Sequence, residues 1–120
     1  MVSSGASKVS AVEEFQERAR KTEATLVLLQ FGSPVCTRCP AFSEKLAQLA
    51  EVHDFEWFYC DAHDENDLVE HFGITKLPAY VITKRGSHHP VAAREAATPE
   101  EVHESLKKFS TQNFRLDVEF

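Results

Sequence analysis

The chain has 120 residues and a net charge of −6, and 42% of its residues are apolar. This length fits one domain with its own core, and the composition excludes global disorder. The negative net charge argues against nucleic-acid binding, and the apolar runs, none longer than the four residues of Leu26 to Leu29, are too short to span a membrane. Three cysteines do not fit a secreted disulfide scaffold, and no apolar signal segment opens the chain. We therefore expect a cytoplasmic protein that contacts neither nucleic acid nor membrane.

The first quarter of the chain predicts a flexible start, a helix and a strand. Residues 1–9 are mostly small or polar, which is typical of a flexible N-terminus. Ser10 and Glu13 form a capping-box pattern that begins a helix over 10–21. The apolar run over 25–31 contains β-branched residues and predicts a strand buried on both faces.

The middle of the chain continues the alternation of helices and strands. An apolar stripe over 41–52 predicts a second helix, and the apolar run over 55–60 predicts a second buried strand. A third helix is expected over 64–72, with Asp64 as its N-cap. Gly73 stands where a helix-ending residue with left-handed backbone belongs.

The last third of the chain predicts a hairpin and a closing helix. Strands over 80–83 and 91–94 flank a short glycine-containing turn, which predicts antiparallel pairing. Thr98 and Glu101 form a second capping box, which begins the last predicted helix. We expect this helix to end near Ser110. Strands separated by helices imply a right-handed βαβ unit and a central sheet.

Residues 111–120 form a predicted C-terminal extension. Apolar and polar residues alternate from Phe114 to Phe120, which is the pattern of a strand with one apolar face. We expect this segment to pack as an added edge strand on its own domain or on a partner chain.

The motif Cys36-Thr37-Arg38-Cys39 follows a predicted buried strand and opens a predicted helix. Its spacing places both sulfurs on one helical face, close enough for a disulfide with modest adjustment. The free N–H groups and partial positive charge of a helix N-terminus favour a thiolate over a thiol. The motif therefore predicts a redox-active pair in which Cys36 is the nucleophile.

Two other interpretations of the cysteines stay open: a metal site and an inert pair. Cys36, Cys39, Cys60 and His63 spell C-x2-C-x20-C-x2-H, which is close to a zinc-site spacing. However, Cys60 ends an apolar strand, and alternation along that strand points its thiol into the core. We therefore favour the redox pair and assign no metal ligand.

These residues, with several downstream motifs, resemble the thioredoxin family over roughly residues 8–110. The resemblance rests on Cys36 and Cys39 after TLVLLQF, on Asp61 closing the next strand, on Gly73-Ile74-Thr75-Lys76-Leu77-Pro78, and on Lys84-Arg85-Gly86. It implies a thioredoxin-like α/β domain over 10–110, with a mixed sheet of about four or five strands flanked by helices. It also implies that Pro78 is the family's cis-proline and faces the cysteines.

The activity implied by the resemblance is thiol–disulfide exchange on protein or small-thiol disulfides. Cys36 would attack the substrate disulfide and Cys39 would resolve the mixed disulfide. Val35, Leu77 and Pro78 are the implied substrate-binding residues. The family's role in electron transport and cell redox homeostasis implies a thioredoxin reductase or a small thiol as the electron source, and no cofactor in the chain. Neither the substrate nor the oligomeric state follows from the sequence.

Four residues are expected to tune the redox pair because they depart from the family pattern. Thr37 and Arg38 replace the usual Gly-Pro, and Gln30 replaces the buried acid that assists the second cysteine. His63 matches a position that is usually acidic, and its ring is expected near Cys36.

Two further departures affect the motif turn and the choice of function. Val35 stands where the family usually has Trp, and Pro40, directly after Cys39, predicts a looser turn. These departures keep open a redox-inactive binding or scaffold module, besides the metal-binding pair.

Overall fold

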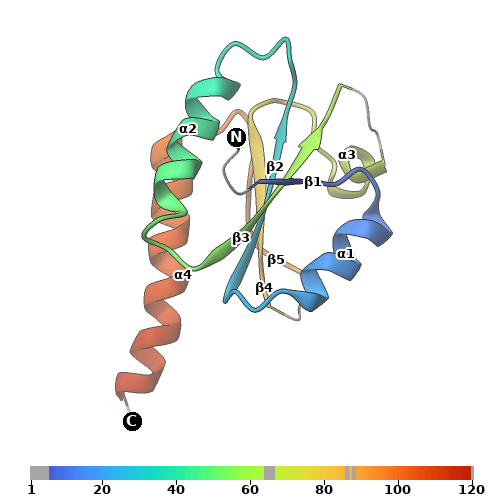
Figure 1. Cartoon of the computed structure of the whole chain (residues 1–120). Coiled ribbons are helices and arrows are strands. Elements are labelled where there is room, and N and C mark those ends of the chain that lie inside the picture. The colour runs from blue at the N-terminus through green and yellow to red at the C-terminus, as the bar shows by residue number, and fades with distance from the viewer. Residues whose placement is uncertain (1–5, 64–66, 86, 88, 120) are drawn as a thin grey trace.

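A five-stranded mixed sheet lies between two pairs of helices (Figure 1). The computed structural model describes residues 6–63, 67–85, 87 and 89–119. The elements in chain order are β1 (Ser7–Lys8), α1 (Val12–Lys21), β2 (Leu26–Gly32), α2 (Cys39–Leu49), β3 (Phe55–Asp61), α3 (Asp67–Phe72), β4 (Ala79–Lys84), β5 (Pro90–Arg94) and α4 (Pro99–Glu119).

The strand order in the sheet is β1-β3-β2-β4-β5. β1 and β2 run parallel to β3, whereas β4 is antiparallel to both β2 and β5. The predicted mixed sheet and closing hairpin are confirmed. The flexible N-terminus predicted over 1–9 is wrong for its described part, which forms β1 and buries Val9. Two residues are too few to show a strand periodicity in the sequence. Gly32 pairs with Asp61, so β2 and β3 end at the same edge of the sheet.

The side chains of β2 build the core on both faces of the sheet. All seven of its residues are buried, as expected for a strand covered on both sides. Alternate side chains of this strand point to opposite faces of the sheet and belong to two separate apolar clusters. The cluster on the α1 and α3 side includes Phe15, Val27, Leu29, Phe31 and Leu68. The cluster on the α2 and α4 side includes Leu26, Leu28, Phe42, Leu46, Val102 and Leu106.

Two of the predicted helix ends are confirmed. The Glu101 N–H donates to Thr98 Oγ1 at 3.2 Å, and the Thr98 N–H donates to Glu101 Oε1 at 3.0 Å. This reciprocal pair is the expected capping box of α4. Gly73 follows α3 with φ of 67°, the left-handed backbone that ends this helix. The proposed N-cap of α3, Asp64, lies outside the described residues.

The predicted capping box of α1 is wrong. The helix begins at Val12 with Ala11 as N-cap, and the structure has no side-chain cap there. Instead, the Val12 N–H donates to Asp67 Oδ2 at 2.9 Å, and the Ser10 N–H donates to Glu14 Oε1 at 3.0 Å. A carboxylate from α3 therefore takes the place of a local cap.

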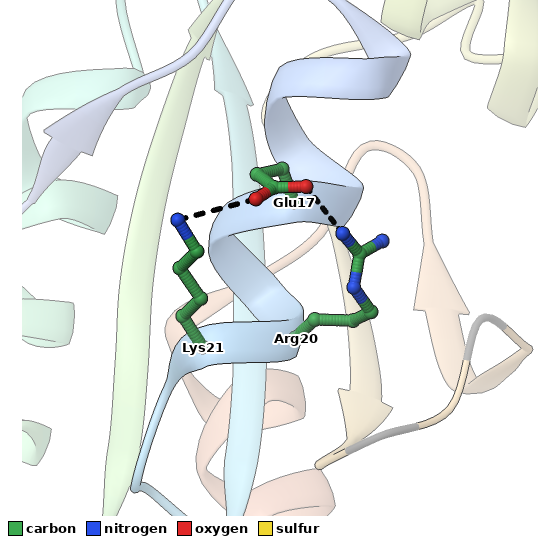
Figure 2. Close-up of polar contacts among 3 residues, drawn as sticks. All are labelled: Glu17, Arg20 and Lys21. Carbon is green, nitrogen blue, oxygen red and sulfur yellow. Dashed lines mark hydrogen bonds and ion pairs between the residues drawn. The ribbon is translucent and has the colours of Figure 1, made fainter.

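The outer face of α1 carries a small charged cluster (Figure 2). Glu17 pairs with Lys21 at 3.2 Å and also with Arg20, and the hydrogen bond from Lys21 contributes most to lowering the pKa of this carboxyl. All three side chains are about half exposed or more. Exposed pairs of this kind add little to stability, so we assign the cluster no functional role.

The extra strand predicted over 114–120 is wrong for the described part of that segment, which continues α4 to Glu119. The helix also passes well beyond the end expected near Ser110. No glycine or proline lies between Glu100 and Glu119, and extending a formed helix is easier than nucleating one. Figure 1 shows the last turns of α4 running past the end of the sheet. None of the described helices is both long and apolar enough to cross a membrane.

Candidate active site

Cys36 and Cys39 form a disulfide in the turn between β2 and α2, with their Cα atoms 5.4 Å apart. The turn is closed by two backbone hydrogen bonds, from the Cys36 N–H to Ser33 O at 3.2 Å and from the Cys39 N–H to Cys36 O at 3.3 Å. Cys36 is partly exposed, whereas Cys39 is only 5% exposed. A substrate can therefore reach the first sulfur but not the second.

The position of Pro40 explains why this turn is regular rather than loose. α2 begins at Cys39 with Arg38 as its N-cap, so Pro40 falls in the first helical turn. Backbone N–H groups there have no partner within the helix, so proline loses nothing. The first helical bond runs instead from the Phe42 N–H to Arg38 O at 3.2 Å. Pro40 would disturb the turn if Cys36 were the N-cap of α2, but Arg38 is the N-cap, so the looser turn predicted from Pro40 is wrong.

A shallow hollow opens beside Cys36 and brings most of the predicted substrate-side residues together. It is lined by Ser33, Val35, Cys36, Thr37, Arg38, Thr75 and Leu77. Val35 lies at its rim and is 76% exposed. The Leu77–Pro78 peptide is cis, as the family resemblance implied, and Pro78 itself is buried.

Glu95 holds the loop that forms the far wall of this hollow. Its Oε1 accepts hydrogen bonds from the Thr75 N–H at 2.7 Å, Thr75 Oγ1 at 2.8 Å and the Lys76 N–H at 3.0 Å. These bonds, first that from the Thr75 N–H, lower the pKa of the Glu95 carboxyl. The Ala97 N–H donates to Pro78 O at 2.8 Å in the same region. No local pattern in the sequence indicated this contact, because its partners are about twenty residues apart.

Gln30 is fully buried and its amide is engaged at both ends. Its Nε2 donates to Ser43 Oγ on α2 at 2.7 Å, and its Oε1 accepts from Trp57 Nε1 on β3 at 3.0 Å. A buried amide suits this position because it donates to one partner and accepts from the other. Gln30 thus links the central strand to the helix that carries Cys39. Its proposed effect on the redox pair stays a prediction.

His63 lies at the same end of the sheet as the cysteine motif, two residues after β3. Its backbone N–H donates to Asp61 Oδ1 at 3.0 Å, and its side chain is exposed. The residues lining the hollow beside Cys36 do not include His63. The expected closeness of its ring to Cys36 stays a prediction.

The four residues of the zinc-like spacing do not converge. Cys60 is buried in the cluster on the α1 and α3 side, whereas Cys39 begins α2 on the opposite side of the sheet. Among the described residues, no group of three or more His, Cys, Asp or Glu side chains could hold a metal ion.

Tyr59 on β3 is a further residue at the site, where the sequence indicated only a core position. A Cβ placed on Gly32 would lie 2.9 Å from its hydroxyl oxygen and 3.4 Å from Cys39 Sγ. The phenol therefore leans across the end of β2 into the space that this glycine leaves open. The only signal for it in the sequence was a glycine at the end of an otherwise apolar strand.

Comparison with known proteins places this geometry in a family. The sequence model of the family described as Thioredoxin matches residues 6–108. The chain belongs to the thioredoxin family. Cys36 and Cys39 occupy the family's active-site position.

Two solved thioredoxins show the same fold at low sequence identity. The thioredoxin of Trichomonas vaginalis superposes with a TM-score of 0.78 at 19% identity, covering 89% of this chain and 99% of that one. The reduced thioredoxin pre-protein of Schistosoma mansoni gives a TM-score of 0.77 at 19% identity, covering 88% of this chain and 99% of that one.

A curated relative is Nucleoredoxin-like protein 1 of Mus musculus, which is 31% identical over a match covering 62% of this chain and 51% of that protein. The chain thus spans about half the length of this relative.

Proposed function

We propose that the protein is a thiol–disulfide oxidoreductase that uses Cys36 and Cys39 as its dithiol/disulfide couple. The observation that carries the proposal is the pairing of a reachable Cys36 with a buried Cys39 at the start of α2. The helix N-terminus favours the thiolate form of the sulfur that must attack.

In the proposed reaction the Cys36 thiolate attacks a substrate disulfide, and one substrate thiolate leaves. Cys39 then attacks the Cys36 sulfur of the mixed disulfide and releases the second substrate thiolate. The products are a reduced substrate and the Cys36–Cys39 disulfide, so two electrons pass to the substrate.

The hollow beside Cys36 suits an extended peptide near a disulfide. Val35 and Leu77 offer apolar contacts, and the cis Leu77–Pro78 segment offers backbone groups for pairing. We propose protein disulfides as substrates in the cytoplasm, with a thioredoxin reductase or a small thiol restoring the dithiol.

A redox-inactive binding module is the second candidate, and Gln30 is the observation that favours it. With Gln30 tied to Ser43 and Trp57, no acid stands at the position that normally assists the second cysteine. A protein of this kind would keep the disulfide and the hollow but would not catalyse thiol–disulfide exchange.

Reduction of insulin disulfides in the presence of dithiothreitol distinguishes the two candidates. We expect activity from the parent protein, none from Cys36→Ser, and a trapped mixed disulfide from Cys39→Ser. Cys60→Ala is the matched control and should retain activity, because Cys60 lies on the far side of the sheet. Parent activity no higher than that of Cys36→Ser would favour the binding module.

A further inference from the structure

The end of β2 next to Cys39 is shaped around the hydroxyl of Tyr59. Gly32 makes room for the Tyr59 ring because it has no side chain. A Cβ added there would lie only 2.9 Å from the hydroxyl oxygen and 3.0 Å from Cε1 of that ring. The same point lies 3.4 Å from Cys39 Sγ. The phenol oxygen and the second sulfur of the redox pair therefore approach one spot on the central strand.

The Tyr59 hydroxyl is available as a hydrogen-bond donor. It makes no hydrogen bond to another described residue, in contrast to the Tyr80 hydroxyl, which lies against Glu101 O at 3.1 Å and Ser105 Oγ at 2.8 Å. Burial, followed by the nearby Asp61 and Cys60, raises the pKa of Tyr59 above its ordinary value. The phenol thus keeps its proton at neutral pH and acts as a donor, not as a base.

The other polar side chains near Tyr59 are less suited to this task. Gln30 donates to Ser43 and accepts from Trp57, so both ends of its amide are used. The Asp61 carboxylate, whose Oδ1 accepts from the His63 N–H, is an acceptor and cannot donate a hydrogen bond to a thiolate. Glu44 is exposed at the rim of a second hollow, which Tyr59 and Pro40 also line.

We propose that Tyr59 is a catalytic residue whose hydroxyl donates a hydrogen bond to the Cys39 sulfur whenever the Cys36–Cys39 disulfide is open. A hydrogen bond to a charged form stabilises that form, so the bond holds Cys39 as a thiolate. Tyr59 would in this way take over the assistance that the family draws from a buried acid and that Gln30 does not supply.

The step balances without a further reactant, and it rests on the proposed function. The Cys39 thiolate forms a bond to the Cys36 sulfur, the bond from Cys36 to the substrate sulfur breaks, and the substrate leaves as a thiolate. Tyr59 keeps its proton throughout and releases its hydrogen bond as the Cys39 sulfur becomes neutral. The proton that Cys39 loses beforehand passes to solvent.

Tyr59→Phe tests the proposal by removing only the hydroxyl. The titration of Cys39 is read by NMR of its Cβ carbon in a Cys36→Ser background, where no disulfide can form within the motif. We expect Tyr59→Phe to move the midpoint upward by about one pH unit, and to slow release of substrate from a mixed disulfide on Cys36 about tenfold near neutral pH. Attack by Cys36 on a substrate disulfide should stay unchanged.

Two more variants separate this role from a structural one. Tyr80→Phe is the matched control, because it removes a tyrosine hydroxyl of β4 that is more deeply buried and bonds to α4. Its Cys39 titration should match the parent. Gly32→Ala should push the Tyr59 hydroxyl away and raise the Cys39 midpoint, with little further effect once Tyr59→Phe is present.

An unchanged Cys39 midpoint in Tyr59→Phe would overturn the proposal, and so would an equal change in Tyr80→Phe. The titration does not depend on turnover, so it judges the role of Tyr59 even if the parent reduces no substrate. If the parent protein fails to reduce a disulfide substrate, that result would count against the proposed function alone.

Discussion

Arg38 offers a direct test of how charge sets the redox potential of the cysteine pair. Arg38 is exposed, occupies the N-cap position of α2 and lines the same hollow as Cys36. A cation beside a thiolate stabilises the reduced form relative to the disulfide. Replacing Arg38 with an uncharged residue should therefore make the couple more reducing.

The exposure of Arg38 limits the size of the effect. Two unit charges about 4 Å apart interact by about 1 kcal/mol in a water-like dielectric, and less at greater separation. Because about 1.4 kcal/mol corresponds to about 30 mV for a two-electron couple, we expect a change of about 10–20 mV. Arg38→Met is a cleaner change than Arg38→Pro, which would also restrict the backbone of the turn.

Equilibration of the Cys36–Cys39 couple with a glutathione redox buffer measures this change. Arg38→Met should lower the potential at low salt, and Arg38→Lys, which keeps the charge, should leave it near the parent value. The difference should shrink in about 1 M salt, where the screening length falls to about 3 Å. An unchanged potential in Arg38→Met, or an equal change in Arg38→Lys, would refute the charge argument.

Three further changes test contacts that position the site. Gln30→Leu leaves the buried Trp57 N–H without its acceptor and should lower the free energy of unfolding by about 2–3 kcal/mol in urea denaturation. In the double variant Gln30→Leu/Trp57→Phe, the loss should be smaller than the sum of the losses in the two single variants. Glu95→Gln should weaken the Thr75 loop at neutral pH. Folding lowers the pKa of Glu95, so the difference in unfolding free energy between parent and variant should shrink as the pH falls below about 4.5 and this carboxyl becomes protonated. A difference that grows in acid would contradict this. Gly73→Ala should cost about 1–2 kcal/mol in thermal unfolding and Gly73→Asn less, because φ is 67° there and the surrounding space is open; equal losses would point to another cause.

Local patterns in the sequence were sufficient for most of the fold. The Thr98–Glu101 box and Gly73 marked helix ends correctly, because each is decided by residues within one turn. The cysteine motif was found because its spacing and its place after a buried strand are both local.

The errors and omissions arose where distant residues decide the outcome. α1 is capped by Asp67, 55 residues away, so the local box at Ser10 was misleading. Glu95 and Tyr59 reach the site through space from other elements, and no periodicity records such contacts. Alternation from Phe114 onward predicts a strand, but the segment lacks a helix breaker and continues α4 instead.

The sheet also fixes how many electrons the protein can exchange. Cys60 is buried on one side of it and Cys39 begins the helix on the other, so the intact backbone of β2 and β3 stands between the third thiol and the redox pair. Oxidation of the folded chain therefore ends at one disulfide and two electrons. Counted with a thiol reagent, the oxidised protein should show no reactive group when folded and one, Cys60, after denaturation.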